Sequence, residues 1–169
     1  MPGVNYGTGS RQNAVTGADE PTFSNTNFVV MTRKTQVLSR GAGVKCGSVV
    51  RLKLSGENLF LHSHKAFESP LSGNQEVTGF EVLDSGDEWQ VECIAAENKE
   101  KSTEDNLWLR EMPIKLKHVD TGKYLQMLPN KAYDRPISGH LEVSCAKAPE
   151  KNNHVFIAME GFYFNQQKD

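Results

Sequence analysis

The chain has 169 residues, a length typical of a single domain. Its 19 Lys and Arg against 21 Asp and Glu give a formal net charge of −2, which argues against a dedicated nucleic-acid binder and against a polybasic membrane-binding surface. The longest apolar runs have only about four to six residues, too few for a transmembrane helix. The composition therefore predicts one globular domain without a membrane span.

Short sequence words recur along the chain. Residues 72–77 (Ser-Gly-Asn-Gln-Glu-Val) are echoed at 138–143 and, more weakly, at 10–15, and the closing valines are 62 and 66 residues apart. This recurrence predicts three related units within a single domain. Because the opening strands of the first unit would fall before residue 1, we expect the sequence to begin inside its first repeat. The units are a partial first repeat at 1–40, a second at 41–100 and a third at 106–164.

The predicted elements of these units are strands. Apolar and basic residues alternate over 50–54, and the pattern returns over 114–118, which is typical of half-buried strands. Each segment leads through a turn into a second apolar strand, at 59–61 and 124–126. Clusters of Gly, Asn, Asp, Ser and Pro interrupt the chain about every 8–12 residues, as in all-β barrels. The predicted fold class is all-β, and three four-stranded units favour a β-trefoil.

One aromatic residue falls near the end of each predicted unit, and these residues are Phe28, Trp89 and Phe156. A large aromatic side chain at one position per repeat most often packs in a shared core, so we expect all three to be buried there. The alternative is that they form platforms on which a ligand stacks.

Two histidines, His62 and His64, are placed as in an H-x-H pair on a strand, so both side chains could point to one face and bind a metal ion. Glu68 and Glu76 are the only nearby candidates for a third ligand. The simpler interpretation is that both imidazoles hydrogen-bond the backbone of the loop at 69–76. We therefore predict no metal site and no cofactor.

Catalytic and redox motifs are missing from the sequence. It contains no Gly-x-Ser-x-Gly elbow, Walker loop or Rossmann fingerprint, which argues against an enzyme. The three cysteines, Cys46, Cys93 and Cys145, show no C-x-x-C spacing, so a structural zinc site is not expected. Their odd number leaves two alternatives, which are one disulfide with one free thiol or three buried thiols.

Polar loops in the second and third units are the best candidates for a partner surface. Recognition of a glycan uses an exposed aromatic ring with amides and carboxylates nearby, although the Gln-x-Trp signature of lectin trefoils is absent. The alternative is a turn network in which Asn and Ser side chains bond nearby backbone. Together with the two histidines, the candidate residues are Phe67, Asn74, Gln75 and Glu76 in the second unit and Tyr133, Arg135, His140 and Glu142 in the third.

Several of these words together resemble a known family. Leu-His-Ser-His at 61–64, followed by Phe-Glu-Ser-Pro-Leu-Ser-Gly-Asn-Gln-Glu-Val at 67–77, resembles the MIR domain, a module of protein O-mannosyltransferases and of inositol trisphosphate and ryanodine receptors. Arg-Pro-Ile-Ser-Gly at 135–139 and Ala-Met-Glu-Gly at 158–161 narrow the resemblance to the family of stromal cell-derived factor two, which consists of three MIR repeats and little else. The third unit departs from the pattern with Leu-Gln-Met-Leu at 125–128.

The resemblance implies a non-catalytic β-trefoil of the endoplasmic reticulum lumen. It implies a role in protein folding quality control, through binding of a J-domain co-chaperone, the lumenal chaperone BiP and client proteins. The final Lys168-Asp169 is similar to the start of a lumenal retrieval signal. An oxidising lumen favours a disulfide, for which we expect Cys46 and Cys93, with Cys145 free. The alternative function is a carbohydrate-binding module or accessory of protein O-mannosylation that binds mannosylated glycans.

Overall fold

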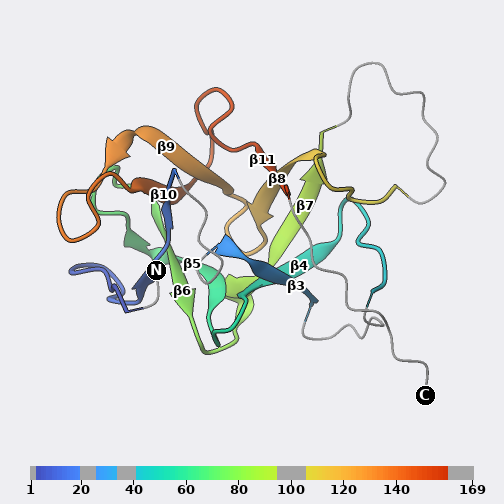
Figure 1. Ribbon diagram of the computed structural model, residues 1–169, viewed down its shortest axis with the longest axis horizontal. Coiled ribbons are helices and arrows are strands. Elements are labelled where there is room, and N and C mark those ends of the chain that lie inside the picture. The colour runs from blue at the N-terminus through green and yellow to red at the C-terminus, as the bar shows by residue number, and fades with distance from the viewer. Residues whose placement is uncertain (1–2, 20–25, 34–40, 95–105, 160–169) are drawn as a thin grey trace.

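The structure is a computed structural model that describes residues 3–19, 26–33, 41–94 and 106–159 (Figure 1). Lys168-Asp169 lies outside these residues. The strands of the described part join in a single 11-stranded sheet, and one turn of 3-10 helix, η1 (Ser85–Asp87), lies between two of them. The strands are β1 (Asn13–Ala14), β2 (Thr16–Gly17), β3 (Phe28–Thr32), β4 (Val49–Leu54), β5 (Phe60–Glu68), β6 (Gln75–Phe80), β7 (Trp89–Cys93), β8 (Pro113–His118), β9 (Tyr124–Ala132), β10 (Leu141–Ala146) and β11 (Phe156–Ile157).

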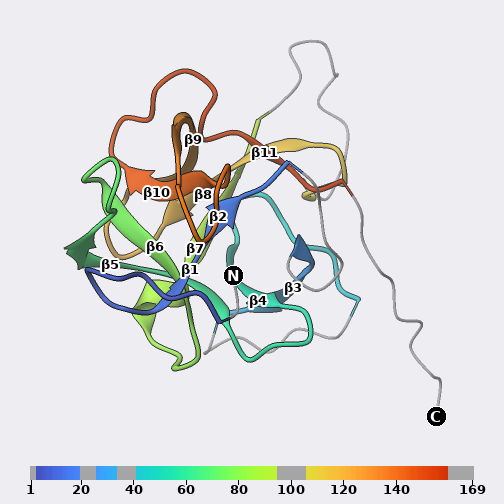
Figure 2. The same ribbon diagram turned by 60° about the vertical axis from the view of Figure 1, so that its left-hand side comes forward.

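Seven of these strands close into a barrel. They follow one another in the order β6, β5, β4, β7, β8, β9 and β10, and β10 pairs in turn with β6 (Figures 1 and 2). The four short or outlying strands attach to this ring, β1 on β6, β2 on β10, β3 on β4 and β11 on β8. The predicted all-β class is confirmed. Within the described residues, no helix is long and apolar enough to cross a lipid bilayer.

The recurring words of the sequence lie on strand pairs with the same register. His62 on β5 pairs with Thr78 on β6, and Gln126 on β9 pairs with Ser144 on β10, 64 and 66 residues further along the chain. A shift of one residue in a strand would turn its side chains to the opposite face of the sheet. The equal registers therefore give both hairpins the same inward-facing positions.

A second set of pairings links the hairpins to one another. Ala14 on β1 pairs with Thr78, Glu76 on β6 pairs with Ser144, and Glu142 on β10 pairs with Thr16 on β2. Each pair joins the hairpin of one predicted unit to that of the next, and the third pair returns to the first. We call these three places the corners of the barrel.

The core lies inside the ring of strands. It is formed by apolar side chains that alternate along neighbouring strands, as the period-two pattern predicts. The indole of Trp89 is fully buried, and its Nε1 donates a hydrogen bond to the Leu61 carbonyl at 2.9 Å. The buried cluster comprises Val50, Leu52, Leu61, Val77, Trp89, Val91, Ile114, Leu116, Leu125, Val143 and Cys145.

The expectation of three equivalent core aromatics is wrong for one of them. Trp89 is buried and Phe156 is half-buried against the core, but 44% of Phe28 is exposed. The backbone position is equivalent, since Phe28 pairs with Leu54 just as Trp89 pairs with His118, 64 residues further along. Burial differs because β3 attaches to the barrel only through β4, whereas β7 lies between β4 and β8.

Candidate functional site

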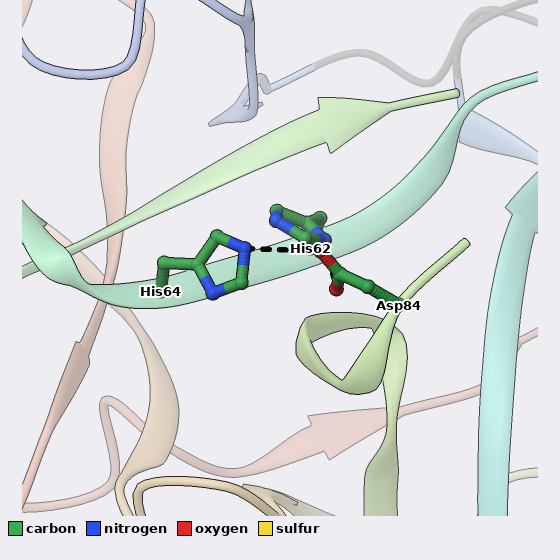
Figure 3. A group of neighbouring side chains, drawn as sticks. All are labelled: His62, His64 and Asp84. Carbon is green, nitrogen blue, oxygen red and sulfur yellow. Dashed lines mark hydrogen bonds and ion pairs between the residues drawn. The ribbon is translucent and has the colours of Figure 1, made fainter. Parts of the chain in front are cut away.

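The two predicted histidines lie beside a pair of carboxylates that the sequence did not associate with them, Asp84 and Asp87, the first of which is drawn with both histidines in Figure 3. His62 on β5 is buried, and its Nδ1 donates a hydrogen bond to Asp87 Oδ1 at 2.8 Å. His64 Nε2 donates to Asp84 Oδ2 at 3.1 Å. The expected bonds to the backbone of the 69–76 loop are wrong, because η1 packs against β5 and brings both carboxylates to the imidazoles.

A potential metal-binding group exists within this cluster. One ligand atom each of His62, His64 and Asp84 lie within 4.8 Å of one another, so the third candidate is Asp84 and neither Glu68 nor Glu76. Asp84 also caps η1, since its Oδ1 accepts the Gly86 N–H at 2.7 Å. Each histidine is thus hydrogen-bonded to one carboxylate at η1, and the buried Nε2 of His62 has no hydrogen-bond partner among the described residues. The two bonds favour a structural role that holds η1 on the barrel.

Gln75 is a buried packing residue in the structure. Its Nε2 donates to Ser63 Oγ at 2.7 Å, and the Ser63 hydroxyl donates to the Glu76 carbonyl at 2.6 Å. Only 2% of the Gln75 side chain is exposed, so it cannot contact a partner at the surface.

The two predicted glutamates are also buried, and each one holds a loop of another unit. Glu142 Oε2 accepts the N–H groups of Leu71 at 2.8 Å and Ser72 at 3.3 Å. Glu76 Oε1 accepts the N–H of Ser10 at 3.2 Å. Ser10 and Ser72 stand 62 residues apart, the offset of the first two units. At equivalent corners, the two carboxylates thus both accept backbone N–H groups of a neighbouring loop.

The loop before β6 has the turn network that the sequence left open. Ser69 N donates to the Asn74 carbonyl at 2.7 Å, and Asn74 N donates to Ser72 Oγ at 3.2 Å. Phe67 and Asn74 are half-buried. Short loop side chains that accept nearby N–H groups stabilise such turns. The network accounts for the Ser, Gly and Asn of this segment without a ligand.

In the third unit, two predicted residues line a cavity of about 330 Å³. Tyr133 and Arg135 lie there, whereas His140 Nδ1 shares a 2.9 Å hydrogen bond with Thr16 Oγ1 on β2. The opposite wall was not predicted, because it comes from a distant segment near the start of the chain. The complete lining is Val4, Asn5, Tyr6, Gly7, Thr8, Ala14, Pro70, Tyr133, Asp134, Arg135, Pro136 and Ile137.

Two phenols meet at this cavity. Burial raises the pKa of Tyr133 to about 12, and it raises the pKa of Tyr6 further. The Tyr6 hydroxyl lies 3.2 Å from the carbonyl oxygens of both Val15 and Val77, to which it donates. Both side chains therefore remain neutral hydrogen-bond donors at physiological pH.

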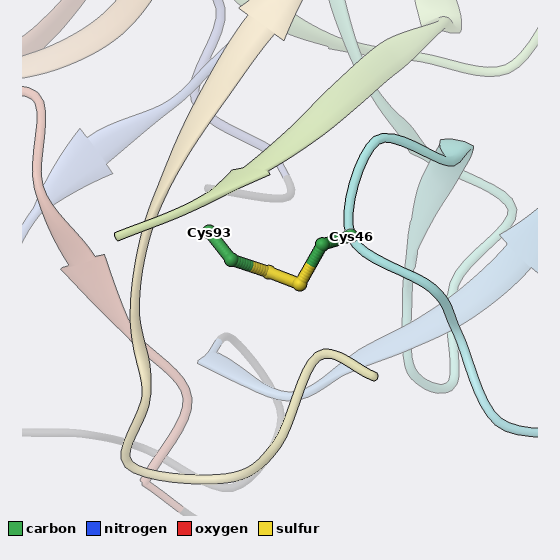
Figure 4. Close-up of a disulfide and its surroundings, with 2 residues drawn as sticks. All are labelled: Cys46 and Cys93. Carbon is green, nitrogen blue, oxygen red and sulfur yellow. A yellow bond between two sulfur atoms is a disulfide. The ribbon is translucent and has the colours of Figure 1, made fainter. Parts of the chain in front are cut away.

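The structure joins Cys46 to Cys93 in a disulfide (Figure 4). Cys46 precedes β4 and Cys93 ends β7, and their Cα atoms are 5.5 Å apart. Cys145 is free and fully buried, and burial raises the pKa of its thiol to about 12. The bridge therefore joins the first and last strands of the predicted second unit.

Comparison with known proteins identifies the family. The MIR-domain family matches residues 5–158. Stromal cell-derived factor 2 of Homo sapiens is 37% identical over 163 residues, which cover 95% of this chain and 71% of that protein. Stromal cell-derived factor 2-like protein of Arabidopsis thaliana is 34% identical, with 95% of this chain and 70% of that protein covered.

Two solved structures share the fold. The crystal structure of the SDF2-like protein from Arabidopsis thaliana has a TM-score of 0.83 at 32% identity, over 98% of this chain and 87% of that chain. The S. cerevisiae protein O-mannosyltransferase Pmt1-Pmt2 complex, bound to the sugar donor, has a TM-score of 0.79 at 22% identity, over 92% of this chain and 22% of that chain. The chain therefore belongs to the MIR-domain family, together with stromal cell-derived factor 2 and its relatives.

Proposed function

We propose that the protein is a non-catalytic component of protein folding quality control in the endoplasmic reticulum lumen. In this role it binds a J-domain co-chaperone, the chaperone BiP and client proteins. The relationship to stromal cell-derived factor 2 over 95% of the chain supports this role. The Cys46–Cys93 disulfide supports the compartment, because such bridges persist in oxidising environments.

The observation that carries the proposal is the apolar strand β3. Four consecutive large apolar side chains on it are at least 40% exposed, namely Phe28, Val29, Val30 and Met31. Exposed apolar patches of this kind mark interaction sites in soluble proteins. The strand β3 is therefore the surface that we propose for binding (Figures 1 and 2).

The strand is held firmly enough to serve as a binding surface. Its residues pair in continuous antiparallel register with β4 from Phe28 to Thr32. Immediately after β3, the Arg33 guanidinium contacts Glu88, with Nε 3.0 Å and Nη2 2.9 Å from Oε2. Glu88 also lies 3.5 Å from Nη2 of the buried Arg51. The occupant that fits β3 is an apolar segment of another protein.

We also propose the finer architecture, a β-trefoil of three units at 1–40, 41–100 and 106–164. The circular pairing at the three corners supports it, because each unit then contacts the next in the same register. An experimental structure tests this directly. The units should superpose under successive rotations of about 120°, and a different rotation would contradict the proposal.

The binding role is tested by charging β3. With the purified chain as bait in lumenal extract, Val30→Glu should reduce capture of the J-domain co-chaperone and BiP at least tenfold, because a charge on an apolar interface must be desolvated. Suppression of aggregation of a misfolded client should fall in parallel. Val82→Glu is the matched control, since Val82 is 57% exposed outside β3.

Both variants should keep the far-UV circular dichroism and the unfolding midpoint of the wild type. Val29→Glu charges the opposite face of the same strand and provides a second test. If β3 variants that remain folded capture both chaperone components as well as Val82→Glu does, the proposed binding surface is wrong.

Carbohydrate binding has less support. Gln75, Glu76 and Glu142 are committed to hydrogen bonds within the fold and are almost fully buried. Tyr133 and Arg135 remain, and both line the cavity of the third unit. A mannosylated ligand is therefore an alternative occupant of this cavity.

A further inference from the structure

The three corners of the barrel are equivalent in register but differ in one side chain. Glu76 and Glu142 occupy two of them, and Ala14 occupies the third. At the first two, the carboxylate fills the space behind a loop and accepts its backbone N–H groups. Alanine has neither the volume nor the acceptor for this task. The third corner therefore lacks the carboxylate that Glu76 and Glu142 provide at the other two corners.

The cavity lies at this third corner. Its lining includes Ala14 together with Arg135, Pro136 and Ile137, from the loop that corresponds to the one held by Glu142. Its volume of about 330 Å³ falls in the range of small-molecule sites. The space behind this loop is open, whereas the chain's own glutamates fill the equivalent spaces.

One positively charged side chain faces the open space. Among the described residues, no carboxylate lies within ion-pair distance of Arg135, which is exposed at the rim. The Tyr133 hydroxyl is buried beside the Tyr6 hydroxyl and is not exposed to the cavity. A ligand carboxylate here would be stabilised by a charge-assisted hydrogen bond to the Arg135 guanidinium.

The remaining lining sets the size and charge of the ligand. Pro70, Pro136 and Ile137 provide apolar contacts, which suit a short aliphatic stem. Asp134 also lines the cavity, and its negative charge disfavours a ligand with several anionic groups. One carboxylate on an apolar stem satisfies both conditions.

We propose that this cavity binds a single carboxylate of a peptide, from either an acidic side chain or a C-terminus. The ligand carboxylate takes the place that glutamate occupies at the other two corners. Arg135 pairs with it, while the stem packs on the prolines. The site is separate from β3, so it does not depend on the function proposed above.

The experiment is a two-dimensional NMR titration of the full chain with matched small ligands. N-acetyl-leucine probes a C-terminal carboxylate, and N-acetyl-glutamate α-methylamide probes an acidic side chain. Each has a neutral twin, N-acetyl-leucinamide and N-acetyl-glutamine α-methylamide. We expect at least one acid to shift the amide resonances of residues 133–138 and to bind at least tenfold more tightly than its twin.

Variants locate the binding. Arg135→Gln should weaken binding of the acid at least tenfold, whereas Lys147→Gln removes an exposed positive charge outside the cavity and should leave it unchanged. Ala14→Glu supplies the missing carboxylate from the chain itself and should abolish binding. If Ala14→Glu does not fold, the Arg135→Gln variant still tests the proposal.

Three results would overturn the proposal. One is equal affinity of an acid and its amide, and another is the absence of shifts at 133–138 at millimolar concentrations of both acids. The third is binding of methyl α-mannoside in place of the acids, which would assign the cavity to carbohydrate. Capture of chaperone components through β3 is measured separately, so failure of one proposal leaves the other intact.

Discussion

His118 is a histidine enclosed by the barrel. Its side chain is fully buried against Trp89, with ring centroids 5.0 Å apart. Nε2 donates to the Gly86 carbonyl at 3.1 Å, and Nδ1 lies 2.9 Å from the Thr121 hydroxyl. Desolvation by burial lowers the pKa of His118, partly opposed by the bond to Gly86. The folded protein therefore favours the neutral ring.

This lowered pKa makes stability depend on pH. The unfolded chain takes up a proton at the ordinary histidine pKa of about 6.5, before the folded protein does. Stability from this residue should therefore be present above about pH 6.5 and fall as the pH decreases towards the folded pKa. We expect the stability advantage of the wild type over His118→Gln to narrow between pH 7.5 and 5 in urea unfolding. A constant difference would contradict this assignment.

Among the elements, the short turn η1 controls the histidine cluster. Gly86 lies at its centre, and a Cβ added there would stand 2.7 Å from both the Ser63 carbonyl oxygen and His62 Cε1. The first of these atoms belongs to the backbone of β5 and cannot move freely. Position 86 therefore requires glycine, because a side chain there would prevent η1 from packing this closely against β5.

Gly86→Ala should lower the free energy of unfolding by about 1–3 kcal/mol, the usual cost of overpacking. Gly7→Ala is the control, since nothing lies within 4 Å of its added Cβ. Equilibrium denaturation of both variants provides the measurement. Equal unfolding midpoints for Gly86→Ala and Gly7→Ala would show that η1 can move away from β5 without loss of stability.

The disulfide ties β7 to the entry of β4 across 47 residues. In the chain-entropy description, closing a loop of this length contributes about 4 kcal/mol by restricting the unfolded chain. The double variant Cys46→Ser, Cys93→Ser should lose stability of this order in urea unfolding. Reducing agent should destabilise the wild type and leave the variant unaffected. Equal stability of variant and oxidised wild type would contradict the prediction.

At the scale of the whole molecule, closure of the ring makes the described strands depend on one another. β6 and β10 belong to different predicted units, yet they pair directly through Glu76 with Ser144 and Gln75 with Cys145. Side chains from both units also share one core around Trp89. Removal of either unit would expose apolar surface on the other.

We therefore expect cooperative unfolding in a single transition. Urea curves followed by tryptophan fluorescence and by far-UV circular dichroism should have coincident midpoints. The fluorescence follows the surroundings of Trp89 and the half-buried Trp108, whereas circular dichroism follows all strands. Separate midpoints would show that the units unfold independently.

Part of this fold was predictable because it depends on local pattern. Alternation of apolar and basic residues at 50–54 and 114–118 specifies strands, and both segments are strands in the structure. The offsets between the recurring words also match the registers of the hairpins. The family resemblance came from the same contiguous words.

Much of the candidate site could not be predicted. The sequence presented Glu76 and Glu142 as surface residues, because polar residues in a loop-rich segment are usually solvated. In the folded chain they lie at the corners, where loops of other units cover them. The partners of His62 and His64 were not predicted for a similar reason. Asp84 and Asp87 follow the next strand, β6, and are therefore distant from both histidines in sequence.

The sequence by itself determined that this chain forms strands, where those strands turn and which family it belongs to, since these follow from neighbouring residues. Only the tertiary structure decided that Phe28 is exposed while Trp89 is buried, and that Ala14 leaves a cavity beside Arg135. The reason is that burial depends on which distant strands become neighbours when the barrel closes, and that pairing is not contained in any single stretch of the chain.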